Sequence, residues 1–192
     1  CKERAIIKRE HRSGMHISSY ITSHLIFEMT LCIVEAVIVT AIICFANRKN
    51  LPDTGVILPT VIELLITFFL IIFSSDSLGL MVSSIVKTPN TAMTVMPFVL
   101  IVQLVMSGMI FELKGFTEKI AKLTVAKWGL NAICITSDIN SLPILIPLEK
   151  ASDEYKYTAG NLSKMWTILI SFTLLYAVIA VISLKFIDKD KR

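Results

Sequence analysis

Long apolar blocks are the feature of this sequence that most limits its fold. They lie at about residues 17–46, 56–86, 91–111 and 165–187, and each is long enough to supply the roughly 20 helical residues that cross the apolar core of a bilayer. Backbone groups inside a bilayer must be hydrogen-bonded within their own segment, so each block is predicted to be a transmembrane α-helix. The chain is 54% hydrophobic and only 18% charged, which argues against a soluble domain. We therefore expect an all-α membrane protein with four transmembrane helices.

Helix-breaking residues separate these blocks. A turn that contains Pro52 and Gly55 follows the first block, and a polar run that contains Pro89 closes the second. Such residues interrupt helices because they favour turns or lack a backbone donor. Pro97 lies inside the third block, where it is expected to kink the helix or mark its first turn.

Residues 112–163 form a long mixed segment between the third and fourth blocks. Apolar residues recur in its first half at helical spacing, with charges between them, at Leu113, Phe116, Ile120 and Leu123. This pattern predicts an amphipathic helix in the membrane interface, where Trp128 is placed to act as an anchor. Prolines and charges after Asn140 predict irregular loop.

Both ends of the chain are basic. Residues 1–16 carry five Lys or Arg within twelve positions, and the tail from Lys185 carries four within eight. The positive-inside rule places both ends in the cytoplasm. The segment of residues 112–163 is then external, although it also holds lysines, because long loops follow this rule weakly. The chain begins at Cys1, and we expect it to be part of a longer protein.

The sequence lacks the common motifs of catalytic and metal sites. It contains no G-x-x-x-x-G-K-[ST] phosphate loop, no H-E-x-x-H and no G-x-S-x-G. The four cysteines have no C-x-x-C spacing, and His11, His16 and His24 do not share one helix face. The net charge of +4 lies at block ends rather than on one face. We expect no catalytic residue, metal, bound cofactor or nucleic-acid partner for this chain.

Four acidic residues lie inside apolar blocks, namely Glu28, Glu35, Glu63 and Asp76. A charge at the bilayer centre costs several kcal/mol, about 3 on insertion scales, so such residues face the bundle interior or water. Glu28 and Glu35 are seven residues apart and share one helix face. One interpretation is a polar stripe that lines a pathway. The other is that Glu28 lies near the interface, while Glu35 or Glu63 is protonated or hydrogen-bonded to another helix. Gln103 in the third block leaves the same two interpretations open.

Three stretches, in this order and spacing, resemble one known family. The first is Glu3-Arg4, Arg9-Glu10, Gly14 and Ser19-Tyr20. The second joins Gly79 to Ser84 with Thr91 to Met93, Pro97 and Ser107 to Phe111. The third is Lys127 to Ala132. They are similar to the loop before the third span, the fourth and fifth spans and the external re-entrant region of ABCG-like ABC exporters, whose membrane domain is a type-two ABC permease.

By this resemblance, the chain carries spans three to six of a six-span permease. The resemblance implies an N-terminal cytoplasmic coupling helix and an external interfacial or re-entrant helical segment. It also implies a second transmembrane half, identical or different, and an ABC ATPase domain, fused upstream or separate, that binds ATP and Mg²⁺. The residues that couple to the ATPase would be Glu3, Arg4, Arg9, Glu10 and Gly14. The residues of the fifth span that face a substrate cavity would be Phe98, Gln103 and Met106.

We thus expect the permease part of an ATP-driven exporter in the cell membrane, with a substrate that the sequence does not identify. The alternative is a four-span anchor or sensor subunit without transport activity. The acidic residues inside the spans and the coupling-like segment of residues 3–16 argue against it, although that segment also reads as a solvated polar boundary. A membrane-embedded enzyme comes third, because no paired catalytic set is evident.

Overall fold

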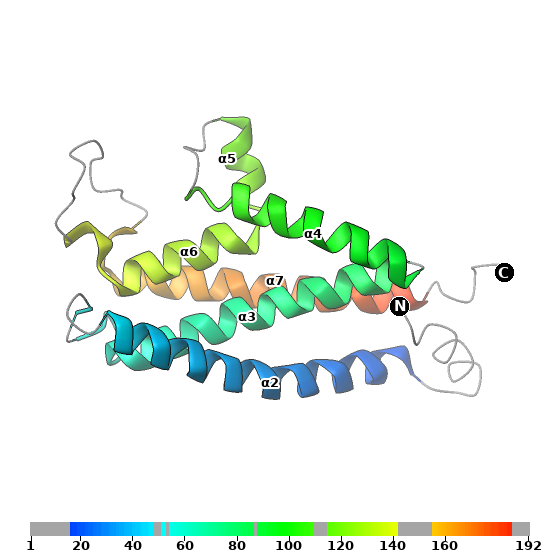
Figure 1. The fold of residues 1–192 in the computed structure, drawn as a ribbon, viewed down its shortest axis with the longest axis horizontal. Helices are drawn as coiled ribbons and strands as arrows, with labels where there is room; N and C mark the ends of the chain where they lie inside the picture. Colours follow the sequence, from blue (N-terminus) through cyan, green and yellow to red (C-terminus); the bar gives the residue numbers. More distant parts are fainter. Residues whose placement is uncertain are drawn as a thin grey trace.

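The computed structural model describes residues 16–47, 51–52, 54–86, 88–109, 115–141 and 155–185, and the regular structure within them is helical (Figure 1). The long helices are α2 (Ile17–Ala46), α3 (Thr60–Ile85) and α7 (Ala159–Lys185). The shorter elements are α4 (Pro89–Val105), α5 (Phe116–Ala121), α6 (Val125–Thr136) and a 3-10 turn at Ile139–Ser141. The predicted all-α class is confirmed.

The helices α2, α3 and α7 are long and apolar enough to cross a membrane. They contain 30, 26 and 27 residues. At a rise of about 1.5 Å per residue, each is longer than the roughly 30 Å core of a bilayer. Large apolar side chains stay exposed on their outer faces, such as Phe27 (63%) and Leu174 (62%). A soluble bundle would turn these side chains inward, so this surface suits contact with lipid.

α3 lies between α2 and α7 (Figure 1). Leu64 and Phe68 of α3 pack in one apolar cluster with Ala36 of α2. A hydrogen bond joins α3 to α7, because Trp166 Nε1 donates to Thr67 Oγ1 over 3.0 Å. α3 is therefore the helix that holds the others together.

The start of α2 and the end of α7 lie at the same end of the bundle (Figure 1). Ile17 and Ile21 form a buried cluster there with Ala180 and Leu184. The chain that joins these two ends must therefore run along the bundle an even number of times.

α4 is shorter than the third predicted span of residues 91–111. It begins at Pro89 after Thr88, whose hydroxyl accepts a hydrogen bond from the Thr91 backbone N–H over 3.3 Å. Proline suits the first turn of a helix because its missing donor is not needed there. The helix ends at Val105, shortly before Gly108 with φ of 86°. Its 17 residues rise only about 25 Å, less than a bilayer core.

α6 lies further along the bundle than α4, beyond α5 (Figure 1). The first residue of α6, Val125, clusters with Leu169 near the middle of α7. Ile135, near its end, clusters with Leu162 at the start of α7. The predicted external segment of residues 112–163 therefore contains a helix that packs against α3 and α7.

Two further helix starts differ from the predicted spans. The second span was expected from residue 56, but α3 begins at Thr60, because Glu63 holds the backbone N–H groups of Ile57 and Leu58 in the preceding turn. The fourth was expected at 165–187, but α7 begins at Ala159. Its first turns are polar, so the apolar pattern alone placed its start too late.

Candidate functional site

A polar cluster lies between α2 and α3. Cys32 is buried and its Sγ donates to Asp76 Oδ2 over 3.1 Å. Glu28 lies one turn before Cys32 on the same face of α2, since residues four apart share a helix face. Its Oε2 atom is buried and has no hydrogen-bond partner among the described residues. Two of the four predicted acidic residues, Glu28 and Asp76, are thus brought to one place.

This cluster borders a cavity of about 870 Å³ between α2, α3 and α4. Small residues of α3 leave room for it, since Ser75, Gly79 and Ser83 recur at four-residue spacing along its wall. The other lining residues are Tyr20, His24, Leu80, Ala92, Met93, Met96 and Leu100. One wall is therefore polar and the wall formed by α4 is apolar.

The other two acidic residues lie apart from this cavity. Glu35 is exposed on α2. Glu63 is fully buried at the opposite end of α3, where its Oε1 accepts hydrogen bonds from the backbone N–H groups of Ile57 and Leu58. A Cβ atom at Gly55 would lie 2.7 Å from the Glu63 carboxylate, so this turn needs a glycine. Glu63 thus anchors the turn before α3.

Phe98 and Gln103 line a second cavity of about 650 Å³ between α3, α4, the α5 region and α7. Gln103 Oε1 also accepts a hydrogen bond from the Ala126 backbone N–H over 3.0 Å. The amide therefore satisfies one of the unpaired donors at the start of α6. Met106 caps α4 through its backbone N–H, and it is not among the residues that line this cavity.

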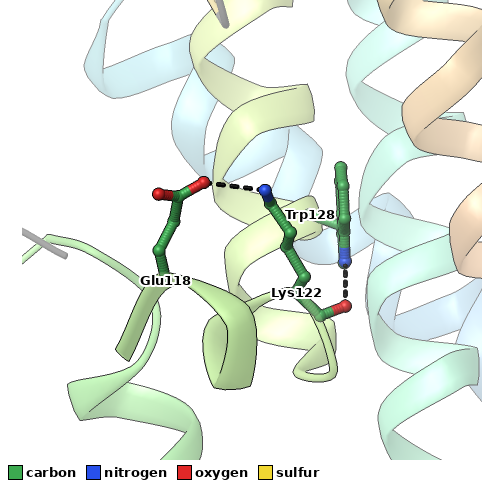
Figure 2. A network of polar contacts seen from close by, with 3 residues as sticks. All are labelled: Glu118, Lys122 and Trp128. Carbon is green, nitrogen blue, oxygen red and sulfur yellow. Dashed lines mark hydrogen bonds and ion pairs between the residues drawn. The ribbon is translucent and has the colours of Figure 1, made fainter. Parts of the chain in front are cut away.

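A polar network fixes the turn between α5 and α6 (Figure 2). Lys122 Nζ pairs with Glu118 Oε1 over 2.7 Å, and Trp128 Nε1 donates to the Lys122 backbone oxygen over 2.8 Å. The hydrogen bond from Lys122, together with its charge, lowers the pKa of the Glu118 carboxyl. Trp128, predicted as an interfacial anchor, holds this turn against α6.

The five residues predicted to couple to an ATPase lie outside the described residues, since Glu3, Arg4, Arg9, Glu10 and Gly14 all precede residue 16. In the part of the chain that the structure describes, no three His, Cys, Asp or Glu side chains are grouped to hold a metal ion.

Comparison with known proteins places this architecture in a family. The model of the ABC-2 type transporter family matches residues 1–136, which is more than half of the chain and includes the predicted coupling segment. The chain belongs to the ABC-2 type transporter family. Among curated relatives, it is similar to the ABC transporter ATP-binding/permease protein Rv1747 of Mycobacterium tuberculosis, with 26% identity over 176 residues. That match covers 91% of this chain but 20% of the relative, so the chain spans about a fifth of the length of that protein.

The sequence did not point to several residues that line the larger cavity of this ABC-2 family chain. His24 and Glu28 are four apart on α2, as are Met96 and Leu100 on α4. That spacing is visible in the sequence, but the methionines of an apolar helix do not show which neighbour they face. Only the packing of α4 against α3 brings them opposite the carboxylates.

Proposed function

We propose that this chain is the transmembrane permease part of an ATP-driven ABC exporter. It works with an ATPase domain, fused upstream or separate, and pairs with a second transmembrane half. The observation that carries the proposal is the alignment of 91% of the chain with an ATP-binding/permease protein. The chain itself has no G-x-x-x-x-G-K-[ST] phosphate loop, so the ATP-binding function must come from elsewhere.

The arrangement of the helices supports this function. The start of α2 and the end of α7 lie together, and the basic segments next to them support a cytoplasmic position for that end by the positive-inside rule. Residues 3–16 directly precede α2, so a movement of an ATPase against them reaches the bundle through that helix. A cavity lined by two carboxylates lies beside the same helix, so a movement of α2 would change the shape of this cavity.

The substitution Glu10→Ala in the complete transporter tests the coupling. It is expected to leave the protein in the membrane and ATP hydrolysis measurable, while export falls at least severalfold, because hydrolysis no longer moves the helices. Export is followed by untargeted mass spectrometry of the compounds outside cells that carry the gene, lack it, or carry the variant. Lys119→Ala, on the predicted external segment and exposed, serves as the control and should export normally.

Two results would count against the proposal. Purified protein without associated ATP hydrolysis, together with identical external compounds in cells with and without the gene, would favour an anchor or sensor subunit. Normal export by the Glu10→Ala variant would remove the coupling role from that residue.

A further inference from the structure

The carboxylates of the cavity between α2, α3 and α4 are incompletely compensated. Asp76 accepts a hydrogen bond from the Cys32 thiol, which is a weak donor. Glu28 Oε2 is buried without a hydrogen-bond partner among the described residues. The described residues that line the cavity include no lysine or arginine. Tyr20 and His24 are the other titratable groups on the wall, and their rings meet edge to face with centroids 4.6 Å apart. Glu28 and Asp76 are partly buried, and a carboxylate held in apolar surroundings without a cation is costly, so a positive group here would be favoured.

The size and the opposite wall of the cavity say which positive group fits. A volume of about 870 Å³ lies within the range of sites for small organic molecules and far exceeds the roughly 30 Å³ of one water. The wall that α4 contributes is apolar and includes Met93, Met96 and Leu100. Methionine adapts to ligands of irregular shape because its side chain is flexible and polarizable. A bare inorganic ion would leave this wall without contacts.

We propose that this cavity binds an amphipathic organic cation, with its positive group at Glu28 and Asp76 and its apolar body against Met93, Met96 and Leu100. Such a cation has two sources, a soluble hydrophobic amine and an aminolipid of the surrounding bilayer. The residues of this site all come from one protomer, and binding to it is measured without ATP. A negative binding result would therefore leave the proposed function intact.

The test measures binding of radiolabelled tetraphenylphosphonium to the complete protein in lipid nanodiscs by equilibrium dialysis. The charge of this probe does not change with pH, so any pH dependence of its binding comes from the protein. Glu28→Gln and Asp76→Asn are each expected to raise its Kd roughly tenfold or more, as loss of a charged partner does. Glu35→Gln is the matched control, because this residue of α2 is exposed and outside the cavity, and it should change the Kd less than twofold.

Two further arms keep the test independent of charge and folding. Ala92→Phe fills the cavity without removing a carboxylate and is expected to weaken binding as well, provided that each variant elutes like the parent protein in size-exclusion chromatography. Neutral triphenylphosphine oxide should bind weakly and equally to the parent protein and to the Glu28→Gln and Asp76→Asn variants. Competition by phosphatidylethanolamine in phosphatidylglycerol nanodiscs would identify an aminolipid as the source, and its absence a soluble amine. An unchanged Kd in the Glu28→Gln and Asp76→Asn variants would overturn the proposal, as would another segment of the complete protein filling the cavity and abolishing binding to the parent.

Discussion

Thr67 and Trp166 show how a single polar pair joins two membrane-spanning helices. Thr67 is fully buried in α3, and its hydroxyl oxygen accepts the Trp166 indole N–H from α7 over 3.0 Å. A buried indole N–H without a partner is costly, because lipid offers no replacement acceptor. The pair therefore fixes the register of α7 against α3 as well as their contact.

Removing this acceptor should destabilise the bundle by a measurable amount. Thr67→Val keeps the branched shape but leaves the Trp166 N–H unpaired, and we expect a loss of about 0.6–1.7 kcal/mol of unfolding free energy, the range for hydrogen bonds between membrane helices. Titration with sodium dodecyl sulfate in mixed micelles, followed by tryptophan fluorescence, measures it. Thr167→Val is the control, since that exposed hydroxyl donates only to Ser163 O of its own helix, over 2.8 Å. Equal effects of the two substitutions would remove the role of the interhelical bond.

Glu63 shows the limit of sequence interpretation at this scale. Its position inside an apolar block left two interpretations open, a pathway residue or a hydrogen-bonded one. Its partners are the backbone N–H groups of Ile57 and Leu58, six and five residues earlier in its own chain. No periodic pattern identifies such a turn, because it depends on the path of the chain around Gly55 and Pro59. Glu28 and Asp76 likewise became neighbours only once α2 was packed against α3.

At the scale of the elements, the long helices were predictable and α6 was not. A run of apolar residues as long as a bilayer is thick leaves few alternatives, so the spans corresponding to α2, α3 and α7 follow from composition alone. α6 contains Lys127 and Asn131, whose polar side chains are expected from the sequence to face water. Both are buried in the structure. Their burial follows from the packing of α6 against α3 and α7, which the sequence does not reveal.

Gly129 explains how α6 comes so close to α3. A Cβ atom at this position would lie 2.9 Å from Cγ1 and 3.1 Å from Cδ1 of Ile71. Gly129→Ala is therefore expected to lower the unfolding free energy by about 1–3 kcal/mol through overpacking, and Ile71→Val, which removes the Cδ1 methyl, should recover part of it. The same detergent titration applies. Gly160→Ala in the first turn of α7 is the control, because nothing lies within 4 Å of its Cβ position. A Gly129→Ala variant as stable as the parent would contradict the close contact.

At the scale of the whole molecule, the number of times that the chain crosses the membrane decides on which side each end lies. The described ends of the bundle lie together, although three helices of the described part of the chain are long enough to span a bilayer, which is an odd number. The helices α4 and α6 supply a further path along the bundle. They are joined by a hydrogen bond, because Gln103 near the end of α4 accepts it from the Ala126 backbone N–H at the start of α6. We expect α4 and α6 together to make the remaining crossing, with α5 between them in the chain. This arrangement predicts opposite exposure of the two ends of α7.

Labelling from one side of the membrane tests that arrangement. In a background without native cysteines, Lys156→Cys, just before α7, should react with a membrane-impermeant maleimide added to intact cells, because the side chain is exposed at the end of the bundle opposite to Ile17 and Leu184. Lys185→Cys, exposed in the last turn of α7, should react only after permeabilisation. Reaction of both positions from outside would mean that α7 does not span the bilayer, whereas reaction of Lys185→Cys alone would reverse the orientation and place residues 3–16 beyond the reach of a cytoplasmic ATPase.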